Sequence, residues 1–116
     1  MIPTIEDTIA LVKRLYDQEL ITSAGIRDSL LTKLEVAQTS YDRGNLTSAV
    51  NQIGAFCNET KAQMSKYITL EAAEALLAYA GTLLFQINLD KARIEAIARI
   101  ERETKKAKEK IQKKKD

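Results

Sequence analysis

The chain has 116 residues, of which 45% are apolar and 5% aromatic, and its net charge is +2. This length suits one domain with a hydrophobic core of its own. One proline and four glycines are too few turn residues for an all-β fold, so we expect a core of aliphatic side chains on helices. The chain has no histidine, the commonest metal ligand and general base, and its single cysteine excludes an intrachain disulfide.

Charge is distributed unevenly along the chain. From Asp90 onward there are eleven basic and six acidic residues, a net charge of +5, whereas the residues before it have seven basic and ten acidic residues, a net charge of −3. No uncharged apolar stretch reaches the ~18 residues that span a bilayer, and charges interrupt the short N-terminal apolar run too often for a signal peptide. We expect no transmembrane segment, a helical bundle domain over residues 1–88 and a basic helical extension over residues 89–116.

The first predicted helix begins near Thr4 and ends near Glu19 or Leu20. Two carboxylates in its first turn favour the positive end of the helix dipole. Apolar side chains recur at spacings of three or four residues and predict one face that packs on a core, comprising Ile5, Ile9, Val12 and Tyr16.

The second predicted helix has Thr22 or Ser23 as its N-cap and an outward-facing Lys33. Gly44 suits the left-handed residue that follows a helix, and Asn45 suits the N-cap of the next helix. So short a connection predicts antiparallel neighbouring helices. The predicted apolar stripe comprises Ile26, Leu30, Leu34, Ala37 and Tyr41.

The third predicted helix runs from about Leu46 to Met64 or Ser65. Gly54 is interpreted as a small residue that allows close approach of another helix. Cys57 is interpreted as a small buried hydrophobic residue; the alternative is a reactive thiol or one that forms an intermolecular disulfide. The predicted inward face comprises Leu46, Ala49, Val50, Ile53, Phe56, Cys57 and Met64.

The fourth predicted helix begins at Leu70, after Thr69 as N-cap. At Asn88 the composition changes, and the helix either breaks there or continues into the charged segment. Continuity is favoured because neither proline nor glycine follows Gly81, and we expect helix to at least Lys110. The predicted apolar face comprises Leu70, Ala73, Leu76, Leu77, Ala80, Leu83, Leu84 and Ile87.

These elements predict an all-α protein, an up-down four-helix bundle with a long, charged C-terminal helical extension. The stretch Ile21-Thr22-Ser23-Ala24-Gly25-Ile26, followed by Ser29-Leu30-Leu31-Thr32-Lys33-Leu34, Gly44-Asn45 and Ala55-Phe56-Cys57-Asn58, resembles the FIMAH domain. The resemblance covers residues 1–86. It implies a non-catalytic module appended to secreted or cell-surface bacterial and archaeal proteins, many of them hydrolases. The resemblance supplies no catalytic or ligand residues to carry over to this chain, and the basic extension departs from the family's pattern.

No catalytic, metal-binding or cofactor-binding residues are predicted. Paired carboxylates such as Glu71 and Glu74 lie at helix starts, where the helix dipole is a sufficient explanation. The four glycines are too widely scattered to form a phosphate-binding loop.

The extension contains the candidate functional residues. Three interpretations stay open: a solvated helical linker, a helix that pairs with a protein partner or a second copy, and a basic surface that binds nucleic acid or anionic lipid. A spacing near 3.5 residues predicts an association seam of Ile94, Ile97, Ile100, Ala107 and Ile111. The candidate polyanion contacts are Lys105, Lys106, Lys108, Lys110, Lys113, Lys114 and Lys115. The preferred function is a non-catalytic structural or protein-interaction module; binding of nucleic acid or anionic membrane is the alternative.

Overall fold

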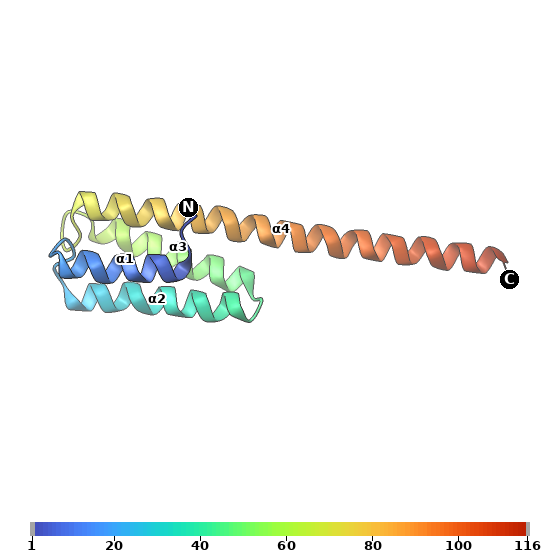
Figure 1. The fold of residues 1–116 in the computed structure, drawn as a ribbon, viewed down its shortest axis with the longest axis horizontal. Helices are drawn as coiled ribbons and strands as arrows, with labels where there is room; N and C mark the ends of the chain where they lie inside the picture. Colours follow the sequence, from blue (N-terminus) through green and yellow to red (C-terminus); the bar gives the residue numbers. More distant parts are fainter. Residues whose placement is uncertain (1, 116) are drawn as a thin grey trace.

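The protein is an up-down four-helix bundle from which the last helix protrudes (Figure 1). The computed structural model describes the backbone of residues 2–115 and the side chains of residues 2–112. The molecule measures 73 × 23 × 20 Å, and the free part of its last helix accounts for the long dimension. The predicted all-α architecture with a long C-terminal helix is confirmed. The helices are α1 (Ile5–Asp17), α2 (Ala24–Asp42), α3 (Leu46–Gln63) and α4 (Leu70–Lys115).

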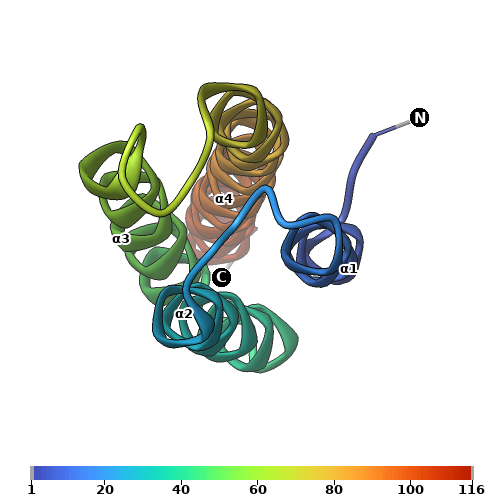
Figure 2. The same ribbon diagram turned by 90° about the vertical axis from the view of Figure 1, so that its left-hand side faces the viewer.

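The four helices form a square in cross-section (Figure 2). Each helix packs on the helices before and after it in the chain, and α1 also packs on α4, which closes the square. The remaining pairs, α1 with α3 and α2 with α4, lie diagonally opposite. Short connections impose this order because consecutive helices must turn back on each other.

Each helix begins at a polar residue whose side chain accepts a hydrogen bond from a free backbone N–H of the first turn. Thr4 accepts from Asp7 N–H at 3.1 Å, and the Asp7 carboxylate accepts from Thr4 N–H at 2.9 Å, which completes a capping box. Ser23, rather than Thr22, caps α2. The predicted caps of α3 and α4 are confirmed: Asn45 Oδ1 accepts from Ser48 N–H, and Thr69 Oγ1 accepts from Ala72 N–H.

The connections α1–α2 and α3–α4 meet at one end of the bundle, which we call the closed end. Ile21 and Ile68 face each other there as an isolated antiparallel bridge, and each is 1% exposed. Thr22 N–H donates to the Tyr67 carbonyl at 2.9 Å, and Thr69 N–H donates to the Leu20 carbonyl at 3.0 Å. Two loops distant in sequence therefore satisfy each other's backbone groups over a buried isoleucine pair.

The core is aliphatic, as the composition predicts, with Phe56 as its only fully buried aromatic side chain among the described residues. Three residues of the predicted apolar faces are exposed instead, because each lies at a helix end where the loops turn away: Tyr41 near the end of α2, at 39% exposed, Met64 at the end of α3 and Leu70 at the start of α4. Met64 is 37% exposed and Leu70 is 56% exposed. The interpretation of Gly54 is also wrong, since a Cβ atom there would meet no heavy atom within 4 Å.

Helix α4 continues without a break past Asn88, as favoured from the sequence. Its last buried side chain is Ile87, and beyond Lys91 every described side chain except Ala98 is exposed. Along the exposed part of the helix, Arg99 pairs with Glu103 at 3.6 Å. We call the part of α4 beyond Lys91 the free half of α4. It is an isolated helix that its own backbone hydrogen bonds stabilise, and the first half of α4 is packed in the bundle.

One part of α4 is long and apolar enough to meet a length-and-composition criterion for a membrane span. The qualifying helix is Leu70–Gln112, and 33% of its most apolar window is buried inside the bundle. Core helices of bundles also meet this criterion, because both kinds of helix are rich in apolar residues. The expectation that the chain has no transmembrane segment stays a prediction.

Candidate functional site

The free half of α4 exposes an apolar stripe to solvent. Its isoleucines, Ile94, Ile97, Ile100 and Ile111, are 59%, 57%, 61% and 56% exposed. The other predicted seam residue, Ala107, is exposed too. Exposed isoleucines that recur along one side of a helix are the usual sign of a missing helical partner.

The stripe begins as a continuation of the face that α4 buries in the bundle. Ile94 follows the buried Ile87 by seven residues, and therefore lies two turns further along the same side of the helix. Ile97 in turn lies fourteen residues beyond the buried Leu83. From Ile97 the spacing to Ile100 is three residues, which shifts the later stripe slightly around the helix. Helix α4 thus has one nearly continuous apolar side, of which the bundle covers only the first half.

A shallow hollow of about 390 Å³ lies where α4 leaves the bundle. Tyr41 and Leu46 from either side of the α2–α3 turn line it, together with Ile94 from α4. Arg93, which binds Asp90 at 3.8 Å, lies at the same place. The hollow joins the apolar surface of the bundle to the stripe on the extension.

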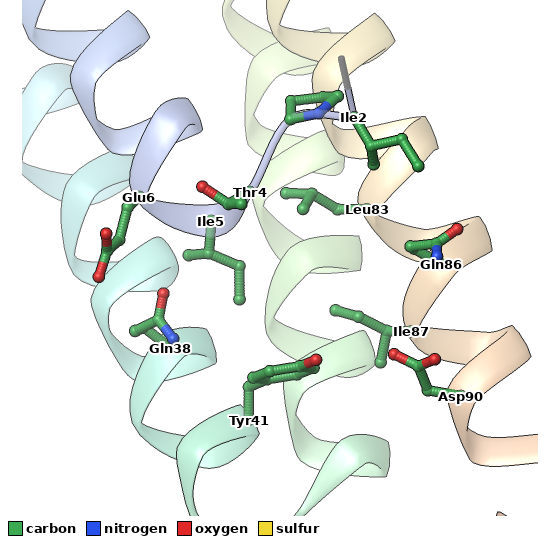
Figure 3. Close-up of a pocket in the computed structure, with 11 residues that line it drawn as sticks. Ile2, Thr4, Ile5, Glu6, Gln38, Tyr41, Leu83, Gln86, Ile87 and Asp90 are labelled. Atoms are coloured by element: carbon green, nitrogen blue, oxygen red, sulfur yellow. The ribbon is translucent and has the colours of Figure 1, made fainter.

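A second depression of about 520 Å³ lies at the open end of the bundle, opposite the closed end (Figure 3). It exists because α1 begins at Ile5, whereas α2 and α4 run on past that level. Its wall combines apolar side chains, such as Ile5 and Leu83, with polar ones, such as Gln38 and Asp90. It is lined by Ile2, Pro3, Thr4, Ile5, Glu6, Gln38, Tyr41, Leu83, Gln86, Ile87 and Asp90.

Four of the candidate polyanion contacts in the extension are solvated. Lys105, Lys106, Lys108 and Lys110 are exposed, and within residues 2–112 none of them forms an ion pair. The side chains of the other candidate contacts, Lys113, Lys114 and Lys115, lie outside the described residues.

A polar cluster between α2 and α3 was missed by the sequence interpretation. Lys33, predicted to face outward, donates to Glu59 at 3.2 Å and to Ser29 at 2.9 Å, and Ser29 donates to the second Glu59 oxygen at 2.8 Å. The spacing of Ser29 and Lys33 by one helical turn is the only sequence signal for it, since Glu59 lies on another helix. The three groups satisfy one another, so the cluster is a structural contact between helices.

Cys57 is half-buried beside the core rather than fully enclosed. Burial raises the pKa of its thiol, and the nearby positive charge of Lys61 partly opposes this shift. A raised pKa disfavours the thiolate, the nucleophilic form, so Cys57 is suited to packing more than to reaction. Among the described residues, no group of three or more potential ligands could hold a metal ion.

The fold and its surfaces define a small all-α module with a projecting helix. The model of the FIMAH domain family matches residues 5–85, most of the chain, and the protein belongs to this family. No curated protein and no solved structure matches the chain. The matched region ends before the free half of α4, so the exposed stripe and the lysines lie outside it.

The structure shows what the first three residues of the motif at residues 21–26 do in the fold. Ile21 is the buried residue of the closed end, Thr22 binds the α3–α4 loop, and Ser23 caps α2. These residues therefore maintain the fold.

Proposed function

We propose that the protein is a non-catalytic structural or protein-interaction module, in which the bundle is an anchor and the free half of α4 is a rigid spacer and association helix. The observation that carries this proposal is the unbroken helix Leu70–Lys115, whose first half is buried in the bundle and whose second half has no buried side chain among the described residues. A helix fixed at one end by a core holds whatever is attached to its other end at a defined distance.

Two further observations support this function. The extension carries an exposed isoleucine stripe, which a purely solvated linker does not need. The FIMAH family implies an appended, non-catalytic module of secreted or cell-surface proteins, a setting in which spacing and association are required. Substantial hydrolase activity of the purified chain would contradict the proposal.

The spacer function requires that α4 be rigid across the point where it leaves the bundle. In a Cys57→Ser background, spin labels at Glu74→Cys and Lys108→Cys should give one narrow distance of about 50 Å when the labelled chain is diluted into an excess of unlabelled chain, because an α-helix rises ~1.5 Å per residue. Double electron–electron resonance measures this distance directly.

Ala96→Pro supplies the matched control, because it breaks the helix between the two labels. It should broaden and shorten that distance, while a second label pair at Glu74→Cys and Asn88→Cys, both inside the bundle, stays unchanged. A broad distribution for the chain without the proline would contradict the spacer function.

A second candidate function is electrostatic binding of a polyanion, nucleic acid or anionic membrane. It is favoured by the four exposed lysines between Lys105 and Lys110, which lack ion-pair partners among the described residues. Such binding weakens steeply with salt because it releases counterions.

Replacing these four lysines by glutamine should weaken binding to duplex DNA or to phosphatidylserine vesicles, because fewer cations remain to neutralise the polyanion. It should also reduce the salt slope of DNA binding by about 0.9 for each phosphate that the chain no longer neutralises. Four basic residues of the bundle, Lys13, Arg14, Lys61 and Lys66, provide a charge-matched control. If both variants bind equally, or neither the variants nor the original chain binds, the polyanion function is wrong.

A further inference from the structure

We propose that the free half of α4 pairs with the same segment of a second copy of the chain, and that the two helices run antiparallel with Ile100 of one copy facing Ile111 of the other. This inference rests on the proposed function, in which the extension presents a helix for association, and it names the partner, the orientation and the register.

The stripe has the spacing of a two-helix seam. Ile97, Ile100, Thr104, Ala107 and Ile111 follow one another by three, four, three and four residues, so they occupy successive a and d positions of a heptad. All five side chains are exposed. In the single chain, none of them is covered by another helix of the described structure. A partner helix with the same spacing, paired so that Ile100 faces Ile111, would remove these two isoleucines from water.

Net charge decides between the two orientations. Residues 90–103 contain four basic and four acidic residues, whereas residues 104–116 contain seven basic and two acidic residues, a net charge of +5. A parallel pair would place two +5 segments side by side, about 10 Å apart, where salt screens them only partly. An antiparallel pair places each +5 segment against a neutral one, which avoids this repulsion.

The residues beside the seam decide the register. With Ile100 facing Ile111 of the second copy, Thr104 faces Ala107, and these small side chains allow close approach at the centre. In this register Glu101 lies beside Lys108 of the second copy, and Glu103 lies beside its Lys110. The twofold symmetry repeats each pairing, so four ion pairs of opposite charge border the seam.

A shift by one heptad reverses this advantage. If Ile97 faced Ala107 and Ile100 faced Thr104, the twofold axis would place Glu101 beside Glu101 of the second copy and Glu103 beside Glu103. Like charges would then border the seam on both sides. Charge therefore selects the register with Ile100 opposite Ile111.

The groups required for these pairs are available in the single chain. Glu101, Lys108 and Lys110 are exposed and form no ion pair within the described residues. Glu103 binds Arg99 of its own helix, but both side chains are largely solvated, at 68% and 75% exposed. Such a contact is weak and can be exchanged for one across the seam.

Disulfide trapping in the full-length chain tests the orientation. In a Cys57→Ser background, one preparation carries Ile100→Cys and a second, distinguishable by a mass tag, carries Ile111→Cys. In the proposed register the two cysteines face each other, whereas Ile100→Cys in one copy lies about 16 Å along the axis from Ile100→Cys in the other. Mild oxidation of the mixture should therefore give the mixed dimer, and oxidation of either preparation alone should give little.

A pair of charge variants tests the register independently. A chain with Glu101→Lys and Glu103→Lys, and a chain with Lys108→Glu and Lys110→Glu, should each be monomeric alone in sedimentation equilibrium. Mixed, they should associate at least as well as the original chain, because all four border pairs regain opposite charges. Glu35→Lys with Glu74→Lys, on exposed bundle positions, is the charge-matched control and should leave association unchanged.

The outcomes separate this inference from the proposed function. Efficient disulfide formation by Ile100→Cys alone would show a parallel pair and overturn the orientation. A chain that stays monomeric at every accessible concentration would overturn self-pairing, but would leave intact a rigid spacer measured by the spin-label distance. A broad spin-label distribution, measured with the labelled chain diluted into an excess of unlabelled chain so that only intramolecular distances contribute, would overturn the spacer itself.

Discussion

Two residues with positive φ show how single positions shape the helix ends. Glu19 has φ 62° and Gly44 has φ 79°, and each follows a helix in the same hydrogen-bonded arrangement. Leu20 N–H donates to the Leu15 carbonyl, just as Asn45 N–H donates to the Ser40 carbonyl. This is the Schellman motif, in which glycine is the least strained occupant of the left-handed position. Glycine occupies it after α2, but glutamate occupies it after α1.

We therefore predict opposite effects at these equivalent positions. Glu19→Gly should raise the free energy of unfolding by about 0.5–1 kcal/mol, because it removes the Cβ strain of a left-handed residue. Gly44→Ala should lower it by about 1 kcal/mol for the same reason. Urea denaturation of both variants beside the original chain measures the difference. Changes of the same sign would show that the two helix ends are not equivalent.

Cys57 gives the bundle a predictable dependence on alkaline pH. Because burial raises the pKa of this thiol, the folded state keeps a proton that the unfolded state loses as pH rises through the ordinary thiol range of about 8.5. The stabilising contribution is therefore complete below that range and is lost as pH rises through the folded pKa.

The measurement is the free energy of unfolding of the original chain and of Cys57→Ala, compared between neutral and alkaline pH. As pH rises, the free energy of unfolding of the original chain should fall relative to that of Cys57→Ala. A difference that does not change with pH would contradict the raised pKa.

At the scale of elements, the contact between α2 and α3 combines apolar packing with the cluster of Ser29, Lys33 and Glu59. The side chains of Lys33 and Glu59 are 28% and 19% exposed, so water screens this pair less than an ordinary surface pair. The cluster joins the middle of one helix to the second half of the next and opposes sliding between them.

Glu59→Ala should lower the free energy of unfolding by about 1 kcal/mol, because Lys33 and Ser29 lose their shared acceptor. A double-mutant cycle with Lys33→Met should give a coupling energy of about 0.5–1 kcal/mol, measured by urea denaturation. Additive effects of the two substitutions would mean that the ion pair contributes nothing to stability.

At the scale of the whole molecule, the bundle and the extension differ in what stabilises them. The bundle is held by a continuous buried core, whereas beyond Lys91 the described extension has no buried side chain. A helix that packs on nothing contributes little to the stability of the part it leaves. The predicted division of the chain at residue 88 can therefore be tested by truncation.

A chain that ends at Leu89 should unfold with a free energy within about 1 kcal/mol of the full chain, since it keeps every buried residue of α4. A chain that ends at Thr82 loses the buried Leu83 and Ile87, and should be destabilised by about 4 kcal/mol or more. Thermal and urea denaturation of the three chains provide the comparison. A large loss in the chain ending at Leu89 would show that the extension belongs to the folding unit.

The sequence alone was sufficient for the helices, their caps and their order, because these depend on local effects. Thr4, Asn45 and Thr69 cap helices through side chains that reach only three residues along the chain. The period of the apolar residues likewise specified the bundle and the uncovered stripe, and the short motifs between Ile21 and Asn58, taken together, indicated the FIMAH family.

Only the tertiary structure decided which residues meet across helices and loops. Glu59 approaches Lys33, and Ile68 covers Ile21, through contacts between segments far apart in sequence, for which helical periodicity contains no information. The exposure of Met64 and Leu70 was likewise decided by the path of the loops, although both satisfy the apolar pattern. Periodicity assigns a residue to a side of its own helix, but burial requires that another element cover that side at that level.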